Sequence, residues 1–545
     1  MKEQIRAFIE GGCKDFAGCG VYPRSLHENG DCVCFAADFG DKDVIIGSNN
    51  CGFEGEELTA GGKSWVIGEQ THTNAVVLRA LFPFTAPCSV LKKDRTAGVG
   101  DRLGIATTGH IRVFEDYDAY PILAQQSIRE LNLTGRTFDD VLDCVSFAVF
   151  RENFTRGFGA DGDHVKTPEE VEYAIKSGYT MITLDCSEHI RNDVLSLSFE
   201  EVKAQYKPNK ELEEKYLGKT FEAEGHKITF DEDSFMRMSL IYNEAIDFAV
   251  SIYNRFFAGK EDELDFEISI DETATPTEPA QHFYVASELI SRGVVPATIA
   301  PRFCGEFQKG IDYIGDLSQF AEEFSVHAAI ARKFGYKISV HSGSDKFSVF
   351  ETVGKYTQGR FHIKTAGTNW LEAMKIVAIH NPDLYRRVHK YALNTAFAEA
   401  RKYYHVTTDL TKIPDVDTLS DAELPELFKN NDSRQLIHIT YGLILTNPEF
   451  RSDLFDTWRK YREEYAEAVH QHIGRHLQMI YSGFKAGSAV FNTESIKNTR
   501  KSFYRTSGSF IPGSSLLIRC LCHQDLLLLT LSETVINVPG YSCNN

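Results

Sequence analysis

Short apolar segments with β-strand character alternate with helical segments along most of the chain. Six of the strand-like segments are GFGADGDHV at 157–165, TMITLDCSEH at 180–189, ELDFEISIDET at 263–273, VPATIAPRF at 295–303, YKISVHSGSD at 336–345 and GRFHIKTAGT at 359–368. The helical segment at 167–178 has a threonine at its N-cap, a proline at its first helical position and a glycine at its end. This alternation favours parallel strands joined by right-handed crossovers through helices.

The number of strand-like segments decides between an open sheet and a barrel. GIATTGHI at 104–111 is expected to be a further strand, with a helix after it over 119–130. A last strand is expected either at YHVTTDL, 404–410, or at LIHITYG, 436–442. Seven or eight strand–helix units fit a closed barrel better than a doubly wound open sheet. The predicted fold class is therefore α/β, a (β/α)8 TIM-type barrel.

Three regions of the chain are expected to differ in organisation. Residues 1–97 contain short β-type runs separated by Gly, Asn and Asp, which predicts an N-terminal strand-rich extension. Residues 98–480 are assigned to the barrel and a C-terminal helical region, with a charged insertion at about 191–230. Residues 481–545 break the pattern, and an atypical, poorly ordered tail is expected there, with a small accessory element as the alternative.

Composition and charge restrict the partners of the chain. The 545 residues include 58 Lys+Arg and 77 Asp+Glu, and the net charge of −19 argues against nucleic acid or an anionic membrane as the partner. The N-terminus lacks the apolar core of a secretory signal, and the run LLLLTL is too short to cross a bilayer. The twelve cysteines have no zinc-site spacing and are expected to be reduced. We expect a soluble cytoplasmic protein, and whether it forms a homo-oligomer stays open.

Ionisable side chains follow five of the strand-like segments. In a parallel barrel the C-terminal strand ends meet at one rim, which carries the active site. A single acid there often only caps the next helix, and a single histidine is often structural. Carboxylates from several strand ends at one rim repel one another and lower the stability of the fold unless a cation neutralises them. The residues concerned are Asp161, Asp163, His164, Asp185, Glu188, His189, Asp271, Glu272, His341, Asp345, Lys364 and Thr365.

These residues predict a site for a divalent metal ion. Mixed histidine and carboxylate ligands without paired thiolates suit Mn²⁺, Zn²⁺, Co²⁺, Ni²⁺ or Fe²⁺. We expect His164, Glu272 and His341 to be the ligands. Asp163 and Asp185 are expected beside the ion as acid–base groups or as partners of its ligands.

A glycine-rich segment, GVGDRLG at 98–104, holds Asp101 and Arg102. It is neither a dinucleotide fingerprint nor a P-loop, so no nicotinamide cofactor is expected. One interpretation is a turn with an ordinary ion pair, and the other places Arg102 beside an anionic group of a substrate. The further candidates for substrate binding are His110, Arg302, Lys346 and Thr365.

Several segments together carry a resemblance to a known family. GVGDRLGIATTGHIR, GADGDHVKTPEE, TLDCSEHI, IDETATPTEPAQHFYVASEL, PRFCGEFQKGIDYIGD, YKISVHSGSDKFSV and FHIKTAGTNWLEA resemble the tagaturonate epimerase family, and the resemblance extends to about residue 480. It implies a divalent-metal-dependent barrel enzyme that interconverts D-tagaturonate and D-fructuronate, two small sugar acids, in hexuronate breakdown.

The two sugar acids differ at a hydroxyl-bearing carbon that is β to the ketone, so removal of its proton would give no ketone-stabilised enolate. Retro-aldol cleavage between the α and β carbons, followed by bond formation on the other face of the aldehyde, would invert that carbon. Transient oxidation by a nicotinamide is the other route, and the missing nucleotide fingerprint favours the first. A metal ion would stabilise the cleaved state. Asp163 and Asp185 are expected to move the hydroxyl proton, and Lys364 to assist electrostatically.

Other functions stay open on the sequence alone. A metal-dependent aldolase or ketose isomerase would use the same barrel and the same ion. A glycoside hydrolase would pair Glu272 with Glu306 across an open cleft. A non-catalytic protein that binds sugar acids would have little need for so many ionisable strand ends.

Overall fold

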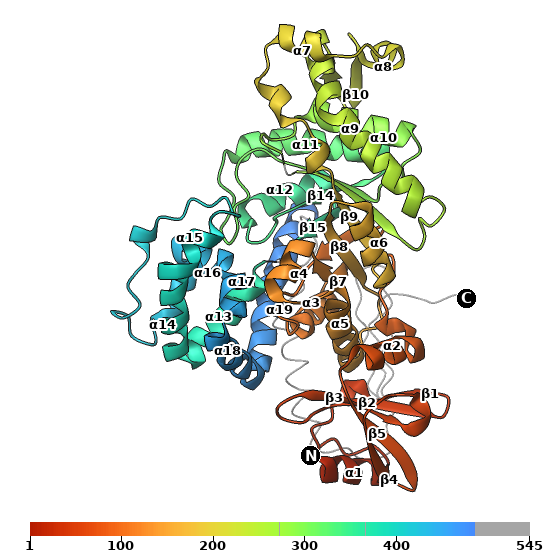
Figure 1. Cartoon of the computed structure of the whole chain (residues 1–545), viewed down its shortest axis with the longest axis vertical. Coiled ribbons are helices and arrows are strands. Elements are labelled where there is room, and N and C mark those ends of the chain that lie inside the picture. Colours follow the sequence, from red (N-terminus) through yellow and green to blue (C-terminus); the bar gives the residue numbers. More distant parts are fainter. Residues whose placement is uncertain (272, 366, 486–545) are drawn as a thin grey trace, which may run out of the picture. The chain divides into compact units, whose positions relative to one another are not determined.

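The structure is a computed structural model that describes residues 1–271, 273–365 and 367–485. Parallel strands close into a barrel in the order β12-β13-β14-β15-β6-β7-β8-β9 (Figure 1). The predicted (β/α)8 fold class is confirmed. The barrel strands are β6 (Arg95–Gly98), β7 (Tyr120–Gln126), β8 (Gly159–Val165), β9 (Met181–Asp185), β12 (Asp265–Ile270), β13 (Thr298–Pro301), β14 (Lys337–Val340) and β15 (Phe361–Lys364).

Helices cover the outside of the barrel, so most strand residues are buried on both faces. Helix α6 begins as its sequence predicts, because Thr167 accepts a hydrogen bond from the Glu170 amide and Pro168 follows it. The helices that follow individual strands are α3 (Thr107–Asp116), α4 (Ile128–Thr134), α5 (Phe138–Glu152), α6 (Pro168–Lys176), α9 (Glu232–Phe256), α10 (Pro279–Ser291), α11 (Leu317–Phe334) and α12 (Phe347–Thr357).

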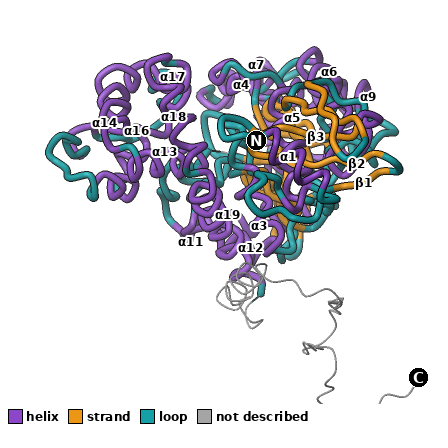
Figure 2. The backbone as a smooth tube through the Cα atoms, turned by 90° about the horizontal axis from the view of Figure 1, so that it is seen from below, coloured by secondary structure: helices purple, strands orange, loops and turns teal. Residues whose placement is uncertain are grey.

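The last described helix, α19 (Arg462–Phe484), packs along α3 and α12 (Figure 2). Glycines make these contacts close. A Cβ atom at Gly354 of α12 would lie 1.9 Å from the Ile480 carbonyl oxygen, and one at Gly109 of α3 would lie 2.6 Å from the Ala466 carbonyl oxygen. Helix α19 therefore fills the place in the outer layer between the helices that follow β14 and β6.

A helical region leads from β15 to α19, as the sequence predicts for the C-terminal part. Its buried residues belong to the same apolar core as those of the barrel. Its helices are α13 (Asn369–His380), α14 (Pro382–Tyr391), α15 (Phe397–Ala400), α16 (Asn431–Ile439), α17 (Tyr441–Thr446) and α18 (Pro448–Lys460).

The segment expected as a charged insertion leaves the barrel after β9 and returns to it through α9. It contains the antiparallel pair β10 and β11, in which Phe221 lies opposite Ile228. Its elements before α9 are α7 (Phe199–Gln205), α8 (Lys210–Tyr216), β10 (Thr220–Ala223) and β11 (His226–Thr229).

The N-terminal part forms an antiparallel sheet of its own in the order β1-β2-β3-β5-β4. Cys32 of β2 and Cys51 form a disulfide, so the expectation that all cysteines are reduced is wrong for this pair. The elements are α1 (Lys2–Glu10), β1 (His27–Asn29), β2 (Cys32–Asp38), β3 (Asp43–Ser48), β4 (Glu56–Ala60), β5 (Lys63–Glu69) and α2 (His72–Leu81).

Three local expectations are wrong although the fold class is right. The segment 104–111, expected as a strand, contains the start of α3, and the helix expected over 119–130 contains strand β7. Neither 404–410 nor 436–442 is a strand, because the first is loop and short 3-10 helix and the second belongs to α16 and α17. The eight strands are complete without them, because β6 and β7 both precede β8. The tail expected over 481–545 lies largely outside the described residues.

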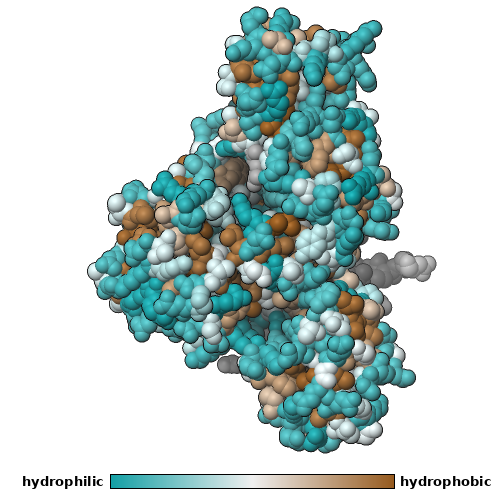
Figure 3. All heavy atoms as spheres, in the orientation of Figure 1, coloured by the Kyte–Doolittle hydropathy of each residue, from teal (hydrophilic) through white to brown (hydrophobic). Residues whose placement is uncertain are grey.

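The face of the molecule in Figure 3 is mainly hydrophilic, with apolar side chains scattered over it. Among the described residues, none of the helices combines the length and the apolar character that a membrane span requires.

Candidate active site

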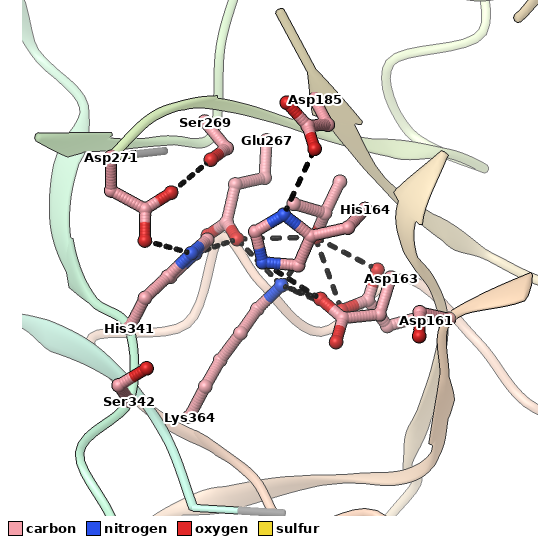
Figure 4. Close-up of polar contacts among 12 residues, drawn as sticks. Asp161, Asp163, His164, Asp185, Glu267, Ser269, Asp271, His341, Ser342 and Lys364 are labelled. Carbon is pink, nitrogen blue, oxygen red and sulfur yellow. Dashed lines mark hydrogen bonds and ion pairs between the residues drawn. The ribbon is translucent and has the colours of Figure 1, made fainter. Parts of the chain in front are cut away.

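Two histidines and one aspartate converge at the C-terminal ends of the barrel strands (Figure 4). His164 lies near the end of β8, Asp271 follows β12, and His341 follows β14. Each can offer one ligand atom, and the three atoms lie within 4.8 Å of one another. The two imidazole rings have centroids 5.0 Å apart and are inclined at 73°. This arrangement has the nitrogen and oxygen donors, and the spacing, that a first-row divalent cation requires.

The second nitrogen of His341 is held by a carboxylate. Its Nε2 lies 2.7 Å from Glu267 Oε1, a residue in the middle of β12. Its Nδ1 lies 3.3 Å from Asp271 Oδ2 and has no hydrogen-bond partner in the described part of the chain. A histidine that binds a metal commonly donates its other N–H to a carboxylate in this way. His341 is therefore oriented with Nδ1 directed to the ligand group.

His164 has a similarly open nitrogen. Its Nδ1 is buried, 3.7 Å from Asp185 Oδ2, and neither atom has a hydrogen-bond partner among the residues that the structure describes. Its backbone has φ of 51°, a left-handed conformation that is uncommon for a side chain other than glycine. A buried nitrogen without a hydrogen bond costs free energy. The unpartnered nitrogens of this polar cluster therefore indicate a ligand-binding site. The described residues thus fit a divalent cation between His164, Asp271 and His341.

Lys364 neutralises carboxylates on the inner side of this group. Its Nζ lies 2.6 Å from Asp163, 2.8 Å from Glu267 and 2.9 Å from Asp161. Burial opposes the charge of Asp163, but Lys364 and the nearby histidines outweigh burial and lower its pKa to about 2. At Asp161 burial is the larger effect and raises the pKa to about 7. Burial opposes the charged form of both histidines, but the carboxylates outweigh it and raise the pKa of His164 to about 10 and that of His341 as well. Surroundings that stabilise positive charge in this way also favour a bound cation.

Asp185 lies on the other side of His164 from Asp163. Its Oδ1 accepts the Ser187 amide at 2.8 Å, and its Oδ2 lies 3.3 Å from Lys166 Nζ. Burial opposes ionisation, but the nearby His164 imidazole and the hydrogen bond from the Ser187 amide lower the pKa of Asp185. Two carboxylates thus flank one imidazole from two directions (Figure 4).

A cavity of about 670 Å³ opens over this group. Its walls come from the strand ends of the barrel and from the helical region around α15, α16 and α17. This volume is within the usual range for small-molecule sites, so the cavity has room for a six-carbon sugar acid. The helical region therefore contributes directly to the site instead of only supporting the barrel.

The cavity brings together seven of the residues expected from the sequence and not the others. Asp101, His110, Arg302 and Thr365 are outside its lining, and Glu272 lies outside the described residues. Glu306, proposed for a hydrolase, is also outside the lining. The residues that line the cavity are Arg102, Asp163, His164, Asp185, His341, Lys346 and Lys364.

Several of the expected binding residues are engaged with the backbone. Asp101 accepts the Leu103 amide at 2.8 Å, and Thr365 Oγ1 donates to the Gly98 carbonyl at 3.1 Å. Arg302 donates to the Thr273 carbonyl. Lys346 Nζ donates to three backbone carbonyls, among them Ile311 at 2.6 Å. These contacts position loops of the rim.

Sequence reasoning did not select four residues that the structure places here. Asp271 is a strand-end acid in the sequence, but the expected ligand is its neighbour Glu272. Glu267 and Lys166 carry a signal, because a glutamate inside an apolar strand and a lysine two residues after His164 are unusual. Lys309 lies in a loop with no pattern, and the sequence holds no signal for it.

A second group, Asp345, His472 and His476, also has ligand atoms within 4.8 Å. Here His476 Nε2 already accepts the Asp345 amide at 3.0 Å, and Arg434 Nη2 lies 2.6 Å from Asp345 Oδ2. The bound guanidinium and the engaged nitrogen are typical of a structural contact. It ties α19 to the loop after β14.

Comparison with known proteins agrees with this architecture. The sequence model of the tagaturonate epimerase family matches residues 22–480. A tagaturonate/fructuronate epimerase from Thermotoga maritima is 42% identical over 477 residues, which cover 86% of this chain and 98% of that protein.

Solved structures show the same relationship. The native crystal structure of fructuronate-tagaturonate epimerase UxaE from Cohnella laeviribosi is 48% identical, with a TM-score of 0.83, and covers 88% of this chain and 99% of its own. The crystal structure of the same protein complexed with one glycerol gives the same values. The expected family is confirmed: the chain belongs to the tagaturonate epimerase family.

Proposed function

We propose that this protein interconverts D-tagaturonate and D-fructuronate with a divalent metal ion held by His164, Asp271 and His341. The observation that carries the proposal is the pair of buried, unpartnered Nδ1 atoms beside a carboxylate in the cavity of a member of this family. When bound, such an ion supplies a Lewis acid that polarises the ketone of the substrate.

The chain's own residues have defined tasks in this proposal. Glu267 fixes the tautomer and direction of His341. Lys364 holds Asp163 ionised, and Asp163 and Asp185 approach His164 from two directions. Two ionised carboxylates in these places provide one base for each face of the reacting carbon.

The reaction that fits the substrate is retro-aldol cleavage and its reversal. One carboxylate takes the proton of the β-hydroxyl, the bond between the α and β carbons breaks, and its electron pair passes toward the ketone. The β-carbon becomes an aldehyde, which turns. The bond then forms again on the other face of the aldehyde, and the proton held by the first carboxylate passes to the new alkoxide oxygen, so that no proton is gained or lost.

Metal analysis of three variants tests the ligand assignment. His341→Ala and Asp271→Asn are expected to lose the bound metal and to lose epimerase activity by about 100-fold or more, since the loss of a ligand weakens the site. The control Glu263→Gln changes an exposed carboxylate before β12 and should leave both unchanged. Glu272→Gln tests whether Asp271 or Glu272 is the carboxylate ligand. If Glu272→Gln loses the metal while Asp271→Asn keeps it, Glu272 is the ligand.

An isotope experiment tests the route. With fructuronate deuterated at the reacting carbon, retro-aldol chemistry retains the deuterium and gives no primary isotope effect. A primary isotope effect would indicate hydride transfer, and loss of the deuterium to solvent would indicate direct deprotonation. Either result contradicts the proposed route.

A further inference from the structure

Beside the metal-ligand group, four side-chain nitrogens line the same cavity. They are Arg102 Nη1, Gln308 Nε2, Lys309 Nζ and His438 Nε2. In the described part of the chain three of them have no hydrogen-bond partner, and the fourth, Lys309 Nζ, has a contact of 3.5 Å to Ser342 Oγ. Buried donors in native proteins are nearly always satisfied by protein, by water or by a ligand. The concentration of these nitrogens, two of them on cationic side chains, indicates that this wall of the cavity receives an anion.

The guanidinium of Arg102 is fixed by two contacts, and one of its nitrogens has no hydrogen-bond partner among the described residues. Its Nε lies 3.0 Å from Glu130 Oε1, and its Nη2 donates to the same oxygen. The guanidinium carbon lies 4.0 Å from the centre of the Tyr441 ring. The side chain is 6% exposed, and Nη1 has no partner. Glu130 and Tyr441 thus fix the guanidinium plane, and Nη1 is available to a carboxylate in a prearranged direction.

The amide of Gln308 is oriented by the helical region. Its Oε1 accepts the Thr407 amide at 3.0 Å and Gln435 Nε2 at 3.0 Å. Both partners are N–H donors, so the amide cannot be turned round without placing donor against donor. The Nε2 group is therefore fixed as a donor, is buried and has no acceptor.

Lys309 supplies the charge that is not already neutralised. Among the described residues, no carboxylate lies within 4.0 Å of its Nζ, which donates a hydrogen bond to Ser342 Oγ at 3.5 Å. Burial and the nearby Arg102 guanidinium lower its pKa, which an added carboxylate would reverse. Ser342 directly follows His341, so Lys309 lies close to the metal-ligand group and is also near Arg102.

A glycine keeps space open next to these donors. A Cβ atom at Gly367 would lie 2.5 Å from His438 Nε2 and 3.8 Å from Arg102 Nη1. Burial and the charges of Arg102 and Lys309 hold the pKa of His438 well below its usual range, so its ring is neutral and adds no charge. Among these four groups Arg102 is paired to Glu130, so the charge that remains for a bound carboxylate is that of Lys309.

We propose that Arg102, Gln308 and Lys309 form a carboxylate subsite that anchors the acid end of the substrate. The inference rests on the proposed function and deepens it. Cleavage between the α and β carbons of the six-carbon keto acid gives two three-carbon fragments, and the acid group stays on the aldehyde fragment. Held at this subsite, that fragment turns its aldehyde about the next carbon–carbon bond and is retained until the bond forms again.

Binding without turnover tests the subsite. Titration calorimetry of the metal-loaded protein with galactonate and with galactitol compares ligands that share a polyol chain and differ in the acid group. The wild-type protein is expected to bind galactonate more tightly, and Lys309→Met to reduce this preference about tenfold or more. Lys309→Arg should keep most of the preference, and the exposed Lys333→Met should keep all of it.

The outcomes separate this inference from the proposed function. If the wild-type protein shows no preference for galactonate, or Lys309→Met keeps it, the subsite is wrong. If the preference behaves as expected but fructuronate is not epimerised, the proposed function fails and the subsite stands.

A second experiment measures whether the subsite retains the three-carbon aldehyde acid during turnover. During turnover of fructuronate, Lys309→Met is expected to release three-carbon fragments, detected by NMR, in at least tenfold higher proportion to epimerised product than the wild type. Slower epimerisation with an unchanged proportion of fragments would overturn the anchoring role during turnover.

Discussion

Lys364 pairs with three carboxylates in the barrel interior. Asp161, Asp163 and Glu267 all lie within 2.9 Å of its Nζ, and the side chain is 5% exposed. Removing one partner of a buried ion cluster leaves the others without compensation in a low-dielectric interior. The metal ligands depend on the same cluster, because Glu267 also orients His341.

Replacing Lys364 by Met is therefore expected to lower the free energy of unfolding by about 3–5 kcal/mol. Urea unfolding of the metal-free protein followed by circular dichroism measures the change. The control Lys355→Met removes an exposed lysine of α12 and should change the free energy of unfolding by less than about 0.5 kcal/mol. A loss below about 1 kcal/mol for Lys364→Met would show that the carboxylates do not need this cation.

At the residue scale, the sequence locates the rim better than it locates individual ligands. His164 and His341 are expected as ligands and do converge, because parallel strand ends meet at one edge. Neighbouring residues after a strand point to different sides, so the choice between Asp271 and Glu272 depends on loop geometry that no pattern encodes. Lys309 lies outside any strand end, and its place depends on the loop after β13.

The contact between α12 and α19 depends on glycines at the level of whole elements. A Cβ at Gly483 would lie 2.0 Å from the Glu351 carbonyl oxygen, and one at Gly354 would lie 1.9 Å from that of Ile480. At such distances the helices must move apart, because the obstacle is backbone and not a flexible side chain.

Gly354→Ala and Gly483→Ala are each expected to destabilise the protein by about 3 kcal/mol. Gly474 of α19 is the matched control, because its nearest neighbour is a Tyr117 ring atom at 3.9 Å. Gly474→Ala should stabilise by up to about 1 kcal/mol through helix propensity. Thermal and urea unfolding measure all three, and equal effects at Gly354 and Gly474 would contradict the close packing.

The two misassigned elements show where periodicity fails. Strand β7 is YPILAQQ, and a short buried apolar run is compatible with either a strand or a helix. Helix α3 contains Thr107, Thr108 and Gly109, which have low helix propensity, and it is stabilised by packing on α19, which is distant in sequence. Strand β6 is only RTAG, too short for a pattern.

At the scale of the whole molecule, an ion network joins the N-terminal sheet to the C-terminal helices. Asp38 of β2 lies 2.6 Å from Arg459 of α18 and 2.6 Å from Arg462 of α19. Burial opposes ionisation of Asp38, but Arg462, the Gly40 amide and Arg459 outweigh burial and lower its pKa. The sequence does not predict this contact, because its partners are separated by most of the chain.

The lowered pKa of Asp38 gives a prediction for the pH dependence of stability. The stabilisation is present above the unfolded-state pKa and is lost as the pH falls through the lower folded-state pKa. Asp38→Asn should cost about 1 kcal/mol of unfolding free energy at pH 7, because the pair is partly exposed. The difference in unfolding free energy between Asp38→Asn and the wild type should become smaller below about pH 4. The exposed control Asp41→Asn should show no such narrowing, and a constant difference for Asp38→Asn would refute the linkage.

The central claim is that one divalent cation at the strand ends makes the chain an epimerase, and a metal titration tests it most directly. Protein stripped with a chelator is titrated with Mn²⁺, Co²⁺, Ni²⁺, Zn²⁺ or Fe²⁺ while the conversion of D-fructuronate to D-tagaturonate is followed. With at least one of these ions, activity is expected to rise in proportion to bound metal and to reach its plateau at one ion per chain. Full activity in the stripped protein, with metal below detection, would contradict the account.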